Sequence, residues 1–211
     1  VNGFDYNIGF NLSTIHNEML KADPNQVLYG SAWKGSGHFV TQTLKGYPVA
    51  SFWLYQTNGI FQSDTEAAAY VNSKGERLQP DAEAGDIRFI DTNGDGSIDA
   101  NDKVYSGSGI PKVEANLSFS GSYKNFDLSF QLGSALGHKL YNVNRLYYEG
   151  MDAGRNYFRS TLNAWTPQNT GSDIPRAVLG DPNQNTRESD RFLENGNFVR
   201  LRQLQLGYSL P

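Results

Sequence analysis

The chain has 211 residues, a formal net charge of −4 and only 19% charged residues. This acidic balance excludes a nucleic-acid surface, which needs a basic face to neutralise phosphates, and the lack of cysteine excludes disulfides and thiolate metal sites. A mean hydropathy of −0.55 excludes a helical membrane protein. The 22 glycines, 12 phenylalanines, 12 tyrosines and 3 tryptophans favour a protein of many strands and turns.

Three segments show the period-two alternation of a strand with one apolar face. The first covers 4–12, the second 113–123 and the third 126–136. Soluble strands cluster near 5–6 residues, whereas membrane-spanning strands need roughly 9–11. The lengths therefore favour an outer-membrane barrel, and a soluble β-sandwich with one covered face is the alternative that shows the same alternation.

Only Lys124 and Asn125 separate the second segment from the third, which predicts an antiparallel hairpin on a two-residue turn. We expect the positive φ of this turn at the asparagine, which tolerates that conformation. Tyr123 and Phe126 flank the turn, where the aromatic girdle of a barrel would lie.

The last apolar run changes phase between Leu201 and Leu204. A strand keeps one face apolar across such a change only through an extra residue, so we expect a β-bulge around 202–203. A further strand is expected across 47–56, which is rich in aromatic residues and bounded by turn-forming glycines.

Two long insertions, 58–112 and 137–197, separate these strands and are too long to be structureless loops. A capping box at 63–66 indicates the start of a helix. Helical segments are expected over 64–73, 143–149 and 155–165. Long loops of barrels face outward and carry recognition, so we expect recognition to lie in the insertions.

Segment 91–102 fits the twelve-residue calcium loop of the EF-hand type, with glycine at loop position 6. The predicted ligands are Asp91, Asn93, Asp95, the carbonyl of Ser97, Asp99 and Asp102. Position 12 holds aspartate instead of glutamate, and the residues that follow do not begin a helix, so a full EF-hand is not expected. The alternative is a polar turn held by hydrogen bonds from side chains to the backbone.

The sequence shows no catalytic constellation. His16, His38 and His138 are far apart and have no metal-ligand spacing. The nucleophile elbow, the dinucleotide-binding glycines and the phosphate-binding P-loop are all missing. We therefore do not expect an enzyme.

Several ordered motifs together are more specific than any one of them. They are Gly-Tyr-Pro at 46–48, Asn-Gly-Ile-Phe-Gln at 58–62, Gly-Asp-Ile-Arg-Phe at 85–89 before the loop at 91–96, Tyr-Lys-Asn-Phe-Asp-Leu at 123–128, and the late segments 189–196 and 201–211. In this order the chain resembles the SusC/RagA-like TonB-dependent outer-membrane transporters of Bacteroidetes over nearly its whole length.

This resemblance implies a mainly β fold: a partial segment, 1–211, of an antiparallel barrel of about 22 strands, with the plug domain and the last strands lying elsewhere. It implies an outer-membrane location in contact with lipid, import of glycans or peptides, a TonB complex that supplies energy, and a SusD-like surface lipoprotein. The competing interpretation is a soluble, calcium-stabilised β-sandwich that binds carbohydrate through Trp33, Trp53 and Trp165.

Overall fold

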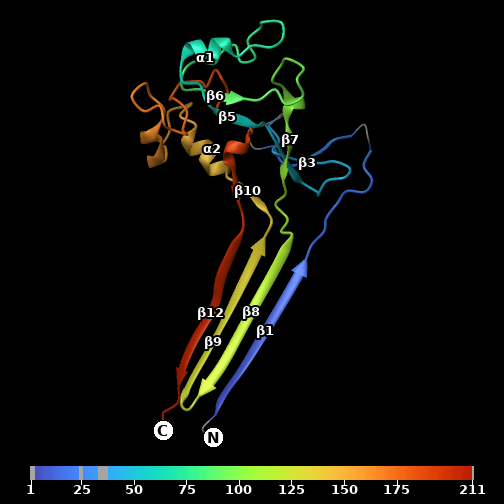
Figure 1. The fold of residues 1–211 in the computed structure, drawn as a ribbon, viewed down its shortest axis with the longest axis vertical. Helices are drawn as coiled ribbons and strands as arrows, with labels where there is room; N and C mark the ends of the chain where they lie inside the picture. The colour runs from blue at the N-terminus through green and yellow to red at the C-terminus, as the bar shows by residue number, and fades with distance from the viewer. Residues whose placement is uncertain (1–2, 24–25, 33–37, 211) are drawn as a thin grey trace.

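The computed structural model describes residues 3–23, 26–32 and 38–210, and its fold has two parts (Figure 1). A long antiparallel sheet forms the lower part, and both ends of the chain lie at its far end. Smaller sheets and short helices gather into a cap at the opposite end. The protein is therefore mainly β, as its composition and alternation predict.

Four strands of 11 residues each form the long sheet, in the order β1-β8-β9-β12. They are β1 (Phe4–Thr14), β8 (Val113–Tyr123), β9 (Phe126–Leu136) and β12 (Phe198–Tyr208). Each neighbouring pair is antiparallel. The three alternating segments of the sequence are thus confirmed as strands.

The hairpin of β8 and β9 closes on Lys124 and Asn125, because Tyr123 pairs with Phe126. The positive φ, 57°, lies at Lys124 and not at Asn125. Positive φ at a central residue is typical of the two-residue hairpin turns, whose backbone twist matches that of paired strands. The hairpin prediction is confirmed, and its assignment of the positive φ was wrong.

The predicted bulge in β12 is confirmed. The register of β12 against β9 shifts between Leu201 and Gln203, so the bulge takes Arg202 out of the pairing. Leu201 then pairs with Leu132 and Leu204 pairs with Phe130, which are residues of one face of β9. One inserted residue therefore keeps the apolar side chains of both halves of β12 on the same side of the sheet.

In the described residues, the cap contains three small sheets and five short helical segments. One sheet has the order β2-β3-β4-β7 and consists of β2 (Leu28–Tyr29), β3 (Thr41–Thr43), β4 (Ser51–Leu54) and β7 (Val104–Gly107). The other two pair β5 (Thr57–Ile60) with β6 (Ile87–Phe89) and β10 (Lys139–Tyr141) with β11 (Leu193–Asn195). The helices are α1 (Asp64–Ala69) and α2 (Val143–Glu149), and the 3₁₀ segments are η1 (Ala100–Asp102), η2 (Arg159–Asn163) and η3 (Asp190–Phe192).

Helix α1 starts where the capping box predicts, since the Ser63 hydroxyl accepts the backbone N–H of Glu66 at 3.1 Å. It ends at Ala69 and does not reach the expected residue 73. Tyr70 leaves the helix because its ring packs against Phe61 and its hydroxyl donates to the Phe89 carbonyl at 2.8 Å. A tertiary contact here overrides local helix propensity.

Two other expected elements are shorter than the sequence suggests. The strand expected over 47–56 is reduced to β4, because Ala50 has a φ of 52° and turns the chain just before it. The helical segment expected over 155–165 contains only the 3₁₀ turn η2. The helix expected over 143–149 is confirmed by α2.

The hydrophobic core lies in the cap. One cluster consists of Phe52, Leu54, Tyr141, Leu146 and Phe192, and a second consists of Phe61, Ala67 and Ala82. The first cluster joins β4 to the insertion 137–197, so segments far apart in sequence share one core. Within the described ranges, no helix has the length and apolarity needed to cross a bilayer.

Gly85 offers a test of this packing. It has a φ of 91°, and an added Cβ would overlap the Trp165 ring and the Arg176 side chain. Gly59 also has a positive φ, 76°, with open space around it. We expect Gly85→Ala to lower the free energy of unfolding by about 2–4 kcal/mol, from left-handed strain and overpacking, and Gly59→Ala by about 1 kcal/mol. Thermal denaturation measures both, and equal losses would contradict the packing described.

Candidate functional site

One face of the long sheet is apolar and exposed along its whole length. Five side chains of β1, namely Phe4, Tyr6, Ile8, Phe10 and Leu12, are 56% to 68% exposed. Backbone register places Ile8, Phe119, Phe130 and Leu204 in one row across the four strands. The rows on either side are Tyr6, Gly121, Leu128 and Leu206, and Phe10, Leu117, Leu132 and Leu201. An apolar surface of this extent marks contact with a membrane or another protein.

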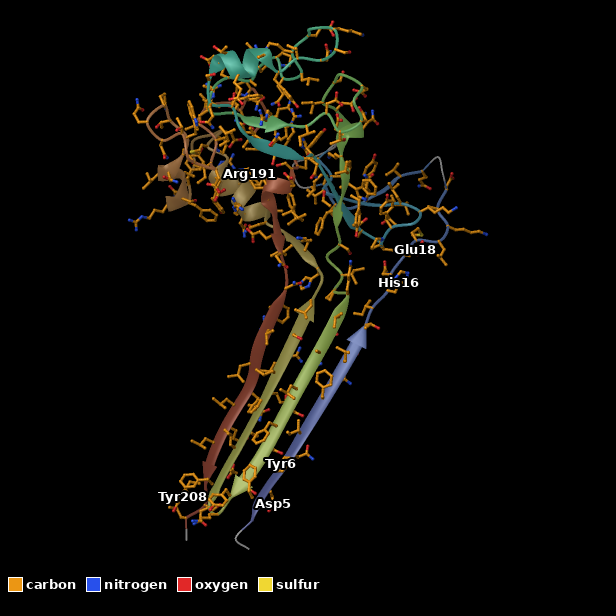
Figure 2. All side chains as sticks on the ribbon, viewed as in Figure 1. Asp5, Tyr6, His16, Glu18, Arg191 and Tyr208 are labelled. Carbon is orange, nitrogen blue, oxygen red and sulfur yellow. The ribbon has the colours of Figure 1, made fainter. Side chains whose placement is uncertain are left out.

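An aromatic row closes this face at its hairpin end. Phe4, Tyr123, Phe126 and Tyr208 follow one another across β1, β8, β9 and β12. The rings of Phe126 and Tyr208 lie 4.7 Å apart, and Tyr208 is labelled at the lower end of the sheet in Figure 2. Amphipathic rings at the edge of an apolar band are typical of a membrane interface. The expected girdle position of Tyr123 and Phe126 fits this row.

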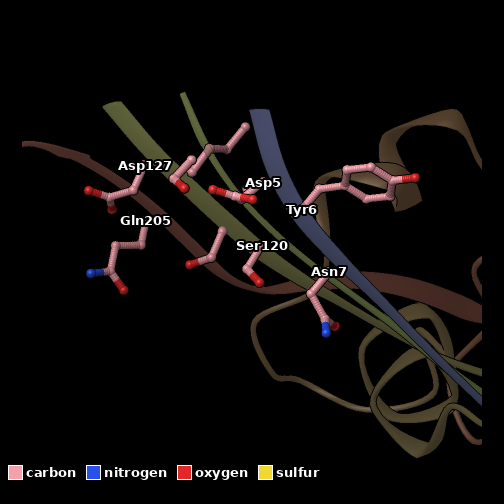
Figure 3. A pocket seen from close by; sticks show the side chains of 10 residues that line it. Asp5, Tyr6, Asn7, Ser120, Asp127 and Gln205 are labelled. Carbon is pink, nitrogen blue, oxygen red and sulfur yellow. The ribbon is translucent and has the colours of Figure 1, made fainter. Parts of the chain in front are cut away.

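The opposite face of the sheet is polar and shallowly hollowed. Figure 3 shows Asp5, Asn7, Ser120, Asp127 and Gln205 along this face, with Tyr6 pointing away from them. They line a trough of about 390 Å³, and a second trough of about 370 Å³ lies further along β1, β8 and β9. The second is lined by Asn11, Asn116, Ser118, Gln131 and Arg202, among others.

A single sheet with one apolar and one polar face separates lipid from water in barrel walls. A sandwich would cover the apolar face with a second sheet about 10 Å away. In the part of the chain that the structure describes, no second sheet covers it. The β-sandwich alternative is therefore wrong for this fold.

A buried ion pair ties the two insertions together in the cap. The Asp86 carboxylate is fully buried and accepts Arg176 Nε at 3.0 Å and Nη2 at 3.1 Å. Asn185 donates to the same carboxylate at 2.8 Å, and its amide oxygen accepts the Ile87 backbone N–H. The hydrogen bond with Asp86 raises the pKa of Arg176 above its usual value. The insertions 58–112 and 137–197 thus form one cap.

A second charged cluster lies within the insertion 137–197. The buried Glu149 carboxylate accepts Arg145 Nη2 and Arg191 Nη2, each at 3.1 Å. Burial lowers the pKa of Arg191, although the charge of Glu149 opposes this effect. The cluster holds α2 against η3, and Arg191 is labelled inside the cap in Figure 2.

In the loop 91–102, side-chain oxygens accept hydrogen bonds from the backbone N–H groups of the same loop. Asp91 accepts the N–H groups of Gly94 at 2.7 Å and Gly96 at 2.8 Å, and the fully buried Asp102 accepts those of Thr92 and Asp99, each at 2.8 Å. Of the other predicted ligands, Asn93, Asp95 and Asp99 each accept a backbone N–H two residues ahead, and Ser97 donates its own N–H to Asp95.

These hydrogen bonds between side chains and backbone are the ones expected if segment 91–102 is a polar turn and not a calcium loop. Across the described ranges, no group of three or more acidic or histidine side chains is arranged to hold a metal ion. Even so, the loop keeps six predicted oxygen donors within twelve residues, as a calcium loop needs. Calcium binding by segment 91–102 therefore stays a prediction.

The tryptophans of the carbohydrate alternative lie in different environments. Trp165 is buried, and its Nε1 donates to Gln62 at 3.1 Å, so it cannot stack on a ligand. Trp53 is half-buried on β4, an inner strand of the four-stranded cap sheet. Trp33 lies outside the described residues. The structure thus leaves Trp53 alone, within the described ranges, as the tryptophan able to meet a ligand.

The histidines do not come together. His16 pairs with Glu18 at 3.4 Å near the top of β1, where Figure 2 labels both. His38 contacts the buried Glu188, and His138 packs edge-on against Phe198. The three histidines therefore lie in separate settings.

Known proteins of similar sequence are receptors. The TonB-dependent receptor P3 of Formosa agariphila is 30% identical over 99% of this chain and 20% of the receptor. The TonB-dependent receptor SusC of Bacteroides thetaiotaomicron is 27% identical over 98% of this chain and 18% of the receptor. The chain thus spans about one fifth of the length of these relatives. No family model matches it.

Two solved structures share the fold. The RagAB peptide transporter matches 99% of this chain with a TM-score of 0.65 and 24% identity, over 21% of its own chain. The RagAB peptide importer in its closed-closed state matches with a TM-score of 0.67 and 22% identity, over the same shares. At these identities the likeness concerns the fold.

The two-faced sheet and its cap define the chain as a partial segment of a large β-barrel with long loops. More specifically, the chain is a segment of a SusC/RagA-like TonB-dependent receptor, which confirms the resemblance of its ordered motifs. These relatives are named as receptors and transporters and not as enzymes.

The ion pair between Asp86 and Arg176 is testable with a matched control. Asp86→Asn leaves Arg176 without its buried partner, so we expect a loss of about 3 kcal/mol in the stability of the cap. Glu83 also binds Arg176, at 2.7 Å, but is 61% exposed. Glu83→Gln should therefore cost less than about 1 kcal/mol. Chemical denaturation compares the two variants, and similar losses would show that Asp86 does not hold the insertions together.

Calcium should stabilise the cap if segment 91–102 binds it. At 100 times the dissociation constant, binding adds about 2.7 kcal/mol, and sites of weak calcium loops lie near 10⁻⁴–10⁻³ M. We expect 10 mM calcium to raise the melting temperature of chelator-treated protein by several degrees, and Asp95→Ala to abolish the rise. Asp81→Asn, outside the loop, serves as control. An unchanged melting temperature at 10 mM calcium would remove the prediction.

Proposed function

We propose that this chain forms part of the membrane wall and the extracellular cap of an outer-membrane transporter that imports glycans or peptides. The exposed apolar face of β1, β8, β9 and β12, backed by a polar face, carries the proposal. In this role the apolar face lies against lipid and the polar troughs face the aqueous interior.

The two edge strands of the long sheet support the proposal that the sheet is part of a larger barrel. Strands β1 and β12 each pair with one neighbour in the described chain. An open edge leaves backbone N–H and C=O groups without partners, which hydrocarbon does not tolerate. Further strands of the same receptor would supply these partners, in keeping with relatives about five times as long.

The cap provides the surface for recognition in this proposal. Its insertions leave apolar side chains exposed, including Tyr147, Tyr148, Phe158 and Leu162. We assign the cap to substrate capture together with a SusD-like surface lipoprotein, and energy input to a TonB complex that engages another part of the receptor. Likeness to SusC and to RagAB supports both assignments.

The proposal covers two substrate classes. One relative is SusC, and the solved relatives are named as a peptide transporter and a peptide importer. At 22–27% identity, the substrate of any of these relatives cannot be assigned to this chain. Transport without catalysis fits the absence of catalytic motifs in the sequence.

A charged residue introduced on each face of β12 in turn tests whether the apolar face lies against lipid. Leu204 lies in the middle row of the apolar face, and Gln205 follows it on the polar face. Arginine near the bilayer midplane costs about 2–4 kcal/mol, so Leu204→Arg should lower the folding stability of the receptor in lipid vesicles by that amount. Gln205→Arg should change it by less than about 1 kcal/mol. A Leu204→Arg receptor that folds as stably as the Gln205→Arg receptor would contradict the lipid assignment.

A further inference from the structure

A small pocket opens on the cap beside Trp53, at the sheet β2-β3-β4-β7. Its volume is about 230 Å³. Residues Tyr29, Phe39, Thr41, Gln42, Trp53, Ala100 and Lys103 line it. The side chains of Tyr29, Gln42 and Trp53 share one face of the sheet, whereas that of Thr41 lies on the opposite face with Phe52. Aromatic walls with a few polar groups are the usual composition of a small-ligand site.

The aromatic walls are held in place before any ligand arrives. Tyr29 and Phe39 stack with ring centroids 4.5 Å apart and an angle of 22° between their planes. Trp53 donates its Nε1–H to the hydroxyl of the fully buried Ser51 at 3.1 Å, and Tyr47 packs edge-on against its ring at 4.9 Å. A rigid aromatic surface loses little conformational entropy on binding.

The Gln42 amide is available to a ligand. It makes no hydrogen bond with the described part of the chain, and it lies on the same face of the sheet as Tyr29 and Trp53. It offers both donors and an acceptor to a ligand with several polar groups.

Among the described residues that line the pocket, the one charged side chain is already engaged. Lys103 Nζ donates to the Phe39 carbonyl at 3.1 Å and approaches the buried Glu188 carboxylate at 3.4 Å. A buried carboxylate needs such partners, because an unpaired one is costly. The pocket therefore offers aromatic faces and neutral hydrogen-bonding groups, with its cation matched by an anion.

We infer that this pocket binds one ring of a neutral saccharide. A sugar ring has a face of C–H groups, which packs on aromatic rings, and a rim of hydroxyls, which suits the Gln42 amide. An anionic sugar would lose hydration without gaining a free cation among the described residues of the pocket wall. The inference deepens the proposed function and rests on it, since it names neutral glycans among the two substrate classes.

Calorimetric titration of the whole receptor in detergent tests the site. The probes are neutral hexasaccharides of glucose, mannose, xylose and galactose, a galacturonate hexamer, and a peptide digest. We expect at least one neutral hexasaccharide to bind, with Trp53→Ala raising its dissociation constant about tenfold or more and Gln42→Ala raising it severalfold. Tyr123→Ala, an exposed aromatic at the hairpin end of the long sheet and outside the cap, should leave it unchanged.

Trp53→Phe keeps a ring and should recover part of the affinity, which separates stacking from loss of fold. Failure of all neutral hexasaccharides to bind, unchanged affinity in Trp53→Ala, or tighter binding of galacturonate or peptide would overturn the inference. The folding stabilities of the Leu204→Arg and Gln205→Arg receptors in lipid vesicles test the transporter proposal independently of saccharide binding. A receptor that passes that comparison and binds no neutral saccharide would contradict the pocket assignment alone.

Discussion

The structure depends on backbone register in the long sheet. Because side chains alternate from face to face, a slip of one residue in any strand would move its whole apolar set to the polar side. The pairs Ile8–Phe119, Phe119–Phe130 and Phe130–Leu204 keep the four sets on one side. In β12 this required an extra residue, and the bulge at Arg202 supplies it. The two-faced wall follows from this alignment.

The cap obeys a different constraint. It is folded from chain segments that leave the sheet at separate points, so contacts between distant residues must hold it together. The bond between Asp86 and Arg176 joins residues 90 positions apart, and the cluster of Phe52, Tyr141 and Phe192 joins β4 to the insertion 137–197 by apolar contact. The wall is thus specified strand by strand, and the cap by long-range pairs. This division suits a receptor whose loops carry recognition on a common scaffold.

What the sequence could predict follows the same division. Alternation is a local signal, so the segments 113–123 and 126–136 and the bulge after Leu201 were readable, as was the start of α1 at its capping box. The end of α1 depends on a contact of Tyr70 with Phe89, which no local pattern contains. Asp86 and Arg176 likewise carried no signal of pairing. The loop 91–102 was recognisable by its spacing, but spacing alone does not decide whether its carboxylates turn to a cation or to the backbone.

The orientation of the apolar face toward lipid is the central claim, and spin labelling measures it directly. The chain has no native cysteine, so Leu204→Cys and Gln205→Cys can each be labelled at a single position within it in the bilayer-reconstituted receptor. The account predicts that a label at 204 is accessible to oxygen dissolved in lipid and shielded from a water-soluble nickel complex, with the reverse at 205. Equal exposure of both labels to the nickel complex, or the opposite order, would contradict it.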